Sequence, residues 1–370
     1  MRIEDVNLDS PDRTADLISG GLAASLLGDA MGAATEMLTA REIRDRYGRV
    51  EGLVAPGRGT FAEGREPGQL TDDGLLTIAL LETLLQRGGN LGADVAARVL
   101  LDWAVDTEVF SRFAGPSSRR AISALREGVV PQQAGAPQPM SNDLRITNGA
   151  AMKVAPAGWA NPGDLNAAVR AACSICIPTH NTDVAFSGAA AVAGSVAVAA
   201  AGGNLGEVLE ASVDAARLGR RIGLAEAFEV PAPDMASRLA LALDVAAAKG
   251  SREERIGWLN ALIGPGLPIT EAVPMAVGAV AVIPDDPMEL IRVIVNLGGD
   301  SDTVAAIAGA IAGTMGGIDA LDADMVATLE RVNGLDIRQI GRRAAAAAAD
   351  RAGGDGPEAT AADCAPEPGL

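Results

Sequence analysis

The feature that most constrains the fold of this chain is a pair of carboxylates placed directly before a long run of small apolar residues. Asp300 and Asp302 follow Gly298-Gly299 and are followed by Thr303 and an Ala-rich segment. In a regular helix, side chains two positions apart point about 200° away from each other, so these carboxylates can converge only in a loop or a first helical turn. The two glycines supply the backbone freedom that such a turn requires.

Two interpretations of this stretch are open. The first is an ordinary helix N-cap, because Asp and Thr are common caps and the helix dipole favours carboxylates there. The second is a binding site, which Thr71-Asp72-Asp73-Gly74 favours, since this stretch also precedes an apolar segment and needs only one Asp for a cap. Together the two clusters offer hard oxygen ligands, which suit Mg²⁺ or Mn²⁺ and do not suit zinc or copper. The candidate metal ligands are Thr71, Asp72, Asp73, Asp300, Asp302 and Thr303.

The composition predicts a large core of closely packed helices. Hydrophobic residues make up 48% of the 370 residues, but aromatic residues only 2%, so small side chains dominate. No segment alternates polar and apolar residues over a strand's length, and we therefore expect an all-α fold. The net charge of −18 argues against nucleic acid or an anionic membrane as a partner, because neither would find a basic surface.

Three features bear on location. The chain has only three cysteines, and the first residues contain no apolar signal segment, so we expect a reducing, cytoplasmic setting. Residues 184–203 are uncharged and long enough to raise the question of a membrane span. Their Ala, Gly and Ser content and the lack of flanking anchor residues instead favour a buried central helix.

Helical spacing of apolar residues predicts helices over most of the chain. Residues 1–13 are predicted to be a lead-in, 14–340 one all-α domain, and 341–370 a disordered Ala/Gly/Pro-rich tail. Residues 40–70 are predicted to be a long loop of the kind that is often functional, and 110–145 have no assignment. The predicted helices cover residues 14–34, 71–85, 91–109, 184–201, 206–227, 234–249, 251–263, 271–283, 286–295, 303–315 and 322–333.

The first predicted helix carries a ridge of small residues that would let another helix approach closely. Asp29 and Glu36 are acidic groups on or just beyond this apolar segment, and a solvated Glu36 is the plain structural interpretation. The ridge consists of Gly21, Ser25, Gly28 and Gly32.

Two further stretches carry polar groups. Asn148-Gly149 predicts a turn that opens a short helix ended by Pro156, and its amide and backbone N–H groups could hold a phosphate or a hydroxyl. His180 is the only histidine of the chain. A lone histidine is usually a satisfied structural group, but this one lies in a loop at the start of a helix, as both Asp clusters do.

Five motifs in this order resemble the ADP-ribosylglycohydrolase family, which includes the dinitrogenase-reductase-activating glycohydrolase. The resemblance covers roughly residues 14–340. The motifs occupy residues 20–36, 70–73, 147–156, 179–180 and 295–309.

The resemblance implies an orthogonal multi-helix bundle with two Mg²⁺ (or Mn²⁺) ions in a cleft, bound by the two Thr/Asp clusters. It implies that Glu36 lies beside the metals, and Glu36 and Asp302 are the candidate proton acceptors for an attacking water. It also implies a cleaved glycosidic bond between ADP-ribose and a protein side chain or small conjugate. Implied substrate contacts are Asn148, Gly149, His180, Gly298, Gly299 and Ser301.

The chain departs from the family pattern at two points. Gly74 follows Thr-Asp-Asp where members often carry a hydroxyl residue, and only nine aromatic residues are present, although protein-directed members stack the adenine on such rings. Phe110 and Phe113 are the candidates for this role. Two alternatives therefore remain: an N-glycosidase of a smaller ribosyl compound such as a nucleoside, and a non-catalytic member comparable to the family's lens crystallins.

Overall fold

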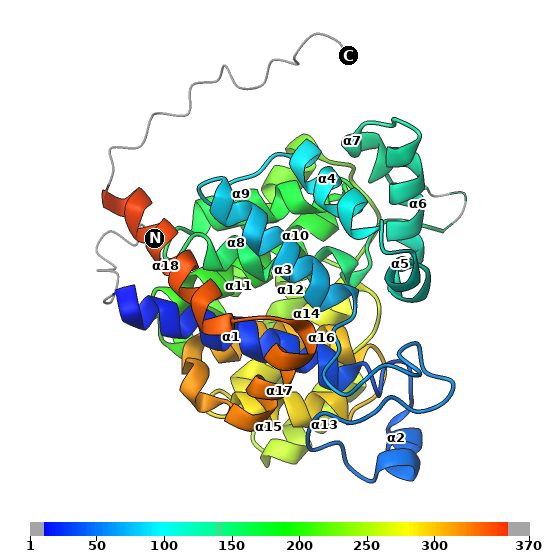
Figure 1. Cartoon of the computed structure of the whole chain (residues 1–370), viewed down its shortest axis with the longest axis vertical. Coiled ribbons are helices and arrows are strands. Elements are labelled where there is room, and N and C mark those ends of the chain that lie inside the picture. Colours follow the sequence, from blue (N-terminus) through cyan, green and yellow to red (C-terminus); the bar gives the residue numbers. More distant parts are fainter. Residues whose placement is uncertain (1–10, 139, 141, 354–370) are drawn as a thin grey trace.

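The computed structural model describes residues 11–138, 140 and 142–353. In this part of the chain helices are the regular elements, and β-pairing is limited to isolated bridges, which confirms the predicted all-α fold (Figure 1). The helices are α1 Pro11–Gly32, α2 Ala40–Tyr47, α3 Asp72–Gln86, α4 Ala93–Trp103, α5 Thr107–Phe113, α6 Pro116–Arg126, α7 Pro131–Ala134, the 3-10 turn η2 Asn148–Ala150, α8 Ala155–Trp159, α9 Leu165–Cys176, α10 Asp183–Ala200, α11 Leu205–Glu226, α12 Met235–Ala246, α13 Arg252–Leu262, α14 Ile269–Val282, α15 Pro287–Val295, α16 Ser301–Gly316, η3 Ile318–Ala320, α17 Ala323–Asn333 and α18 Ile337–Gly353.

The helices α1 and α16 form an antiparallel pair whose backbones touch. A Cβ atom on Gly28 would clash with the backbone of Ala305, and one on Gly32 would clash with Asp302. Gly309 on α16 lies equally close to the backbone of Ala24. The predicted ridge of small residues thus lets another helix approach, and its geometry brings the end of α1 to the start of α16.

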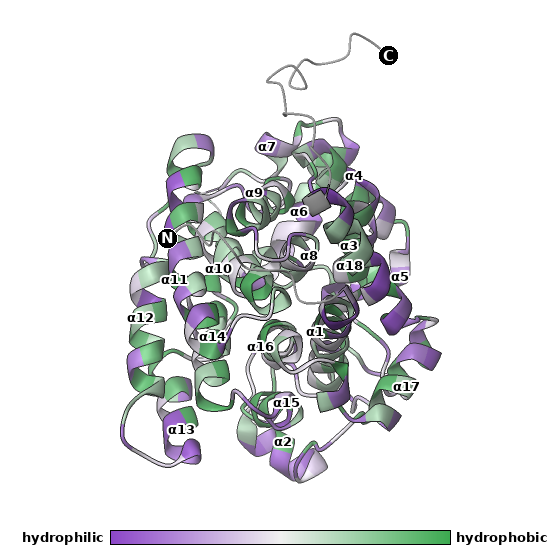
Figure 2. Ribbon diagram, turned by 90° about the vertical axis from the view of Figure 1, so that its left-hand side faces the viewer, coloured by the Kyte–Doolittle hydropathy of each residue, from purple (hydrophilic) through white to green (hydrophobic). Residues whose placement is uncertain are grey.

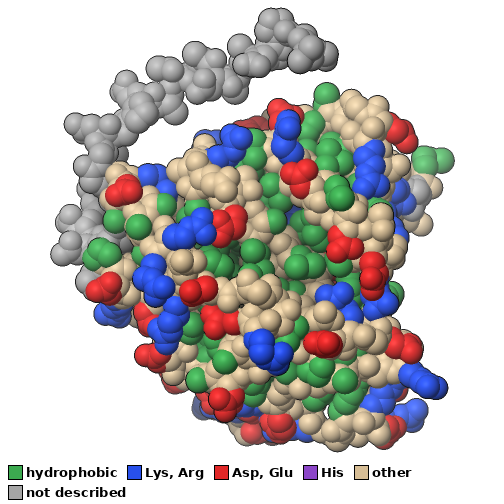
Figure 3. Space-filling view, in the orientation of Figure 1, with side chains coloured by type: hydrophobic (Ala, Val, Ile, Leu, Met, Phe, Trp, Pro, Cys, Tyr) green, Lys and Arg blue, Asp and Glu red, His purple; other side chains and the backbone are tan. Residues whose placement is uncertain are grey.

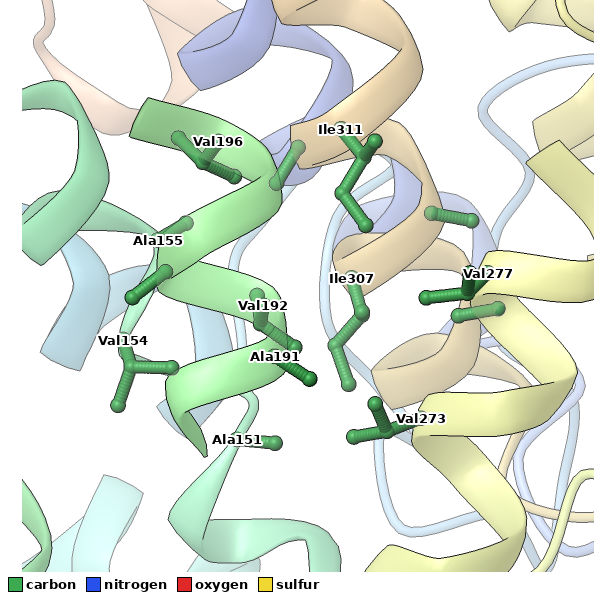
Figure 4. Packing of buried hydrophobic residues seen from close by; sticks show 14 of the residues in the cluster. Ala151, Val154, Ala155, Ala191, Val192, Val196, Val273, Val277, Ile307 and Ile311 are labelled. Carbon is green, nitrogen blue, oxygen red and sulfur yellow. The ribbon is translucent and has the colours of Figure 1, made fainter. Parts of the chain in front are cut away.

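The core of the molecule lies where α10, α14 and α16 meet. Figure 4 shows Ile307 of α16 lying between Val192 of α10 and Val273 of α14. By length and composition α10 could cross a membrane, but every residue from Asp183 to Ala200 is buried inside the protein. The expectation of a buried central helix for this stretch is therefore confirmed.

Three predicted boundaries were wrong. Helix α2 lies inside the predicted long loop, where Thr39 and Glu42 form a capping box. The predicted helix 91–109 is two helices, because Asp106 accepts hydrogen bonds from two backbone N–H groups and starts α5. Pro156 lies in the first turn of α8 and does not end a helix, since proline is tolerated in a first turn, where its missing N–H has no partner to lose.

The predicted tail boundary was also wrong, because residues 341–353 belong to helix α18. This helix packs against α1, where a Cβ on Gly341 would lie 2.7 Å from the carbonyl oxygen of Ala15. Arg343 pairs with Glu82 of α3 through two hydrogen bonds of 2.7 and 2.6 Å. An alanine run is a strong helix former whose small side chains allow close packing. The rest of the predicted tail and most of the predicted lead-in lie outside the described residues, and α1 begins three residues before Thr14.

Candidate active site

The turn before α16 is hydrogen-bonded to the segment that follows α1. Gly298 and Gly299 adopt positive φ angles of 84° and 72°, as the predicted turn requires. The N–H of Met37 donates to the carbonyl of Gly299 at 2.7 Å, and the N–H of Gly299 donates to Leu38 at 3.0 Å. These bonds place Glu36, the residue before Met37, beside the start of α16.

Three carboxylates converge at this point. Glu36, Asp300 and Asp302 each offer an oxygen atom, and these atoms lie within 4.8 Å of one another. Asp300 and Asp302 are buried, whereas Glu36 keeps part of its surface exposed. A solvated Glu36 far from the other acids is thereby excluded.

The start of α3 is held by an acid on α1. Asp29 is fully buried, and its carboxylate accepts hydrogen bonds from the Thr71 hydroxyl at 2.6 Å, the Thr71 N–H at 3.0 Å and the Gly74 N–H at 3.1 Å. A Cβ on Gly74 would lie 2.6 Å from a carboxylate oxygen of Asp29. This contact leaves no room for a side chain at position 74 and accounts for the glycine there.

The two Thr/Asp clusters meet, although more than two hundred positions separate them in the chain. The Thr303 hydroxyl donates a hydrogen bond of 2.8 Å to the carboxylate of Asp73. Thr71, Asp73 and Thr303 are buried, and Asp72 is partly exposed. The structure thus brings all six candidate ligands to one place, while their binding of a metal stays a prediction.

Helix capping accounts for part of the Thr71–Asp73 cluster but not for the Asp300–Thr303 cluster. Thr71 is the N-cap of α3 and accepts a hydrogen bond of 3.3 Å from the N–H of Asp73. Asp300 occupies the N-cap position of α16 but makes no capping hydrogen bond. Its carboxylate instead accepts a bond from the side-chain amide of Asn148. One buried oxygen of Asp302, Oδ1, has no hydrogen-bond partner among the described residues.

The acids of the cluster have strongly raised pKa values. Burial, reinforced by neighbouring carboxylates, raises the pKa of Glu36 to about 8 and that of Asp72 to about 7. Burial raises the pKa of Asp29 to about 6 against the effect of its hydrogen bonds. The pKa values of Asp73 and Asp302 lie well above their ordinary value for the same reason. Burial and mutual repulsion thus favour the protonated carboxyl groups, whereas a bound cation would favour the ionised ones.

This donor set fits a divalent cation with a preference for oxygen. Among the described residues, no Lys or Arg forms an ion pair with any acid of the cluster. Carboxylate and hydroxyl oxygens are the ligands that Mg²⁺ and Mn²⁺ take, and the unpartnered oxygen of Asp302 is available to one.

The predicted substrate turn lies beside this cluster. Asn148 begins η2, and its backbone N–H donates to Leu267 at 2.8 Å. Gly149 lies against the ring of His180, where a Cβ would be 3.3 Å from the ring carbon Cε1. Ser301, also predicted to contact the substrate, is hydrogen-bonded through its hydroxyl to Thr35 at 2.9 Å.

His180 has the character of a structural histidine. Its side chain is 1% exposed, and its two ring nitrogens are hydrogen-bonded to the hydroxyls of Thr147 and Thr179 at 2.7 and 2.8 Å. Burial holds its pKa well below the usual range, so the ring is neutral. The imidazole therefore supports the turn from behind, and direct contact with a substrate stays a prediction.

The candidate adenine-stacking rings are already engaged. Phe110 forms an edge contact with Trp103 at 5.9 Å between ring centroids, and the guanidinium groups of Arg119 and Arg126 lie 5.7 and 5.4 Å from its centroid. The guanidinium group of Arg65 lies 5.0 Å from the centroid of Phe113. Each ring therefore already has at least one arginine side chain packed over it, which reduces the surface available for stacking on an adenine.

Sequence reasoning missed two residues of the site. Asp29 is recognisable in the sequence as an acid on an apolar helix, but its bond to α3 joins segments that are 42 positions apart. Lys153 is absent from the predicted site, but it is 1% exposed and donates a hydrogen bond to the carbonyl of Gly149. A charged residue within an apolar stretch was the available signal for both.

The chain is similar to known proteins over most of its length. The family model described as ADP-ribosylglycohydrolase matches residues 10–354. An uncharacterized protein of Escherichia coli K12, YegU, is 30% identical over 325 residues, covering 87% of this chain and 94% of that protein. The mouse ADP-ribosylhydrolase ARH3 is 27% identical over 343 residues, covering 84% of this chain and 86% of that protein.

A solved structure shares the fold. The chain of an ADP-ribosylglycohydrolase-related protein complex superposes with a TM-score of 0.63 at 20% identity, covering 91% of this chain and 99% of that one. At this identity the likeness concerns the fold alone. The family model and the near full-length match to the Escherichia coli protein show that this chain belongs to the ADP-ribosylglycohydrolase family.

Proposed function

We propose that this protein is a Mg²⁺-dependent hydrolase that cleaves the glycosidic bond of an ADP-ribosylated side chain or a small ADP-ribosyl conjugate. The convergence of Glu36, Asp300 and Asp302 within 4.8 Å carries the proposal. The family membership supports it, as does the similarity to the mouse ADP-ribosylhydrolase ARH3. A partner protein that carries the ADP-ribose group and a cytoplasmic location stay predictions.

The residues that would hold the metals are the six of the two Thr/Asp clusters. When bound, two Mg²⁺ (or Mn²⁺) ions would supply Lewis-acid chemistry, acidifying a water and binding ribose hydroxyls. The bond from Thr303 to Asp73 links the two clusters directly. Because the acids are preassembled on the rigid ends of α1, α3 and α16, the protein pays little ordering entropy when it takes up a cation.

The remaining chemistry belongs to the side chains. Breaking a bond at an anomeric carbon builds positive charge on the sugar, which a cluster of carboxylates stabilises. Glu36 is the proposed proton acceptor for the attacking water, because it is partly exposed and has a pKa of about 8 in the metal-free protein. Asp302 is the second candidate, since one of its oxygens has no partner among the described residues. Asn148 is fixed by Asp300 and would orient the ribosyl group.

A second candidate function is the N-glycosidase of a smaller ribosyl compound, such as a nucleoside. The observation that favours it is the engagement of Phe110 by Trp103 and two arginines, which leaves less aromatic surface for an adenine ring. The non-catalytic alternative is the weakest, because a protein without a ligand would gain nothing from burying the carboxylates of Glu36, Asp300 and Asp302 next to one another.

One panel of substrates tests these alternatives. ADP-ribosyl-arginine, ADP-ribosyl-serine, O-acetyl-ADP-ribose and nucleosides are each incubated with the protein in Mg²⁺ and in EDTA. We expect release of ADP-ribose in Mg²⁺ only, and loss of this activity in Asp302→Asn. Release of ribose from nucleosides alone would favour the second candidate. Turnover that persists in EDTA would refute the metal-dependent mechanism, and no turnover on any substrate would favour the non-catalytic alternative.

A further inference from the structure

Lys153 is a buried cation that the proposed chemistry does not use. Only two of the 30 basic residues of this chain are lysines, and the other one, Lys249, is exposed. The basic side chains on the face drawn in Figure 3 are scattered among acidic ones on the surface. Lys153 is instead 1% exposed and lies between η2 and α8. Burying an ammonium group is unfavourable unless it makes specific interactions.

The ammonium group of Lys153 is bonded to the predicted substrate turn. Nζ donates to the carbonyl oxygen of Gly149, the central residue of η2. The same turn is closed by backbone bonds from Ala151 and Met152 to the carbonyl of Asn148, at 2.7 and 3.0 Å. Lys153 thus ties the two ends of the stretch that positions the Asn148 amide against Asp300.

The surroundings of Lys153 contain acids of the cluster and a thiol. The carboxylates of Asp72 and Asp73 favour its charged form and so oppose the lowering of its pKa by burial. Burial raises the pKa of the Cys176 thiol to about 12, so this group is neutral and is bonded to Ala150 at 3.5 Å. The Gly149 carbonyl is therefore the group that fixes the ammonium in place.

We propose that Lys153 is a positioning residue that holds the Asn148–Ala150 turn in the conformation that meets the substrate. The turn has three supports: His180 packs behind Gly149, Leu267 accepts the N–H of Asn148, and Lys153 binds the carbonyl of Gly149. Removing the ammonium group leaves a carbonyl without its donor and lets the turn rotate. The role in substrate binding rests on the proposed function, whereas the role in holding the turn does not.

Hydrogen exchange of the Lys153→Met variant tests the proposal without any substrate. We expect the amides of Ala151 and Met152 to exchange at least tenfold faster than in the wild type, while α10 and α16 keep their protection. Lys249→Met is the matched control and should change neither. Unchanged exchange at Ala151 and Met152, or equal acceleration in α10 and α16, would overturn the proposal.

A second variant covers the case in which Lys153→Met does not fold. Lys153→Arg keeps a positively charged donor, and wild-type exchange at Ala151 and Met152 is expected for it. Loss of protection at these two amides alone, with α10 intact, would overturn the proposal, because a donor would then not be what holds the turn.

Ligand binding separates this role from a general structural one. In Lys153→Met we expect at least tenfold weaker binding of ADP-ribose by calorimetry, with Mg²⁺ affinity within threefold of the wild type. Metal binding should persist because none of the six candidate ligands belongs to the turn, and Asp300 keeps its backbone bond to Pro265 at 2.8 Å. Parallel losses of both affinities would overturn the positioning role. A wild type that binds no ADP-ribose would refute the proposed function, while the exchange experiment would still decide the role of Lys153.

Discussion

The acidic cluster should make the stability of the metal-free protein fall as the pH rises. Burial raises the pKa values of Asp29, Asp72 and Glu36 to about 6, 7 and 8. A carboxyl group whose pKa is higher in the folded than in the unfolded state stabilises the fold below its unfolded pKa of about 4 and loses this contribution as the pH passes its folded pKa. The loss therefore falls between about pH 4 and pH 8.

The size of the expected loss in unfolding free energy can be estimated from one buried carboxyl group. Asp29 is fully buried, and its shift from 3.8 to about 6 corresponds to about 3 kcal/mol of unfolding free energy. For a chain of this length, that energy lowers the melting temperature by about 4 °C, and Asp72 and Glu36 add to it. A bound divalent cation favours the ionised carboxylates and should remove the decrease.

Thermal unfolding followed by circular dichroism measures this effect in EDTA and in millimolar MgCl₂, from about pH 5 to about pH 9. We expect the melting temperature to fall with pH in EDTA by at least about 4 °C and to stay nearly constant in MgCl₂. The Asp302→Asn variant is the control, since it removes one acid and should reduce both the decrease and the effect of Mg²⁺. A melting temperature that is constant or rises with pH in EDTA would refute the reasoning.

Four further predictions follow from the contacts of individual residues. Asp300→Asn and Asp302→Asn should each abolish Mg²⁺ binding in calorimetry while the helical circular dichroism spectrum is retained, and undiminished uptake in both would show that the ligand assignment is wrong. Gly74→Ala should lower the unfolding free energy by about 1–3 kcal/mol in urea titrations, because its Cβ would lie 2.6 Å from Asp29; wild-type stability would contradict this contact. His180→Ala should raise KM more than it lowers kcat, because the ring supports the turn through two threonines, and a collapse of kcat at constant KM would exclude this role. A chain that ends after residue 340 should melt at least several degrees lower, because it lacks most of α18; an unchanged melting temperature would mean that α18 adds no stability.

The sequence predicts that the two Thr/Asp clusters form one site, because the features that indicate this lie within each cluster. A second Asp beyond the needs of a cap, and the glycine pair before α16, are features of a few adjacent residues. The ridge of small residues on α1 can also be predicted from one segment, since close helix packing requires small side chains at regular spacing. The structure added the partner of that ridge, α16, which a single helix does not specify.

The parts that could not be predicted depend on contacts between distant segments. Nothing near Asp29 in the sequence indicates that it binds the start of α3, and nothing near Asn148 indicates that its amide points at Asp300. The helix α18 was missed because an alanine run with few large apolar residues resembles a disordered tail in composition. Its stability comes from packing against α1, which the local pattern does not reveal.

The arrangement of helices explains how so many acids can be buried although, among the described residues, none of them forms an ion pair with Lys or Arg. The first turns of α3 and α16 contain Asp72, Asp73 and Asp302, so the positive ends of two helix dipoles lie at the cluster. Figure 2 shows α1 and α16 side by side in the middle of the molecule, with α3 above them. Because Gly32 touches the backbone of Asp302, any side chain at position 32 would push the end of α1 away from α16. The distance from Glu36 to the other two carboxylates is therefore set by helix packing. The close contact between α1 and α16 thereby fixes the geometry of the candidate active site.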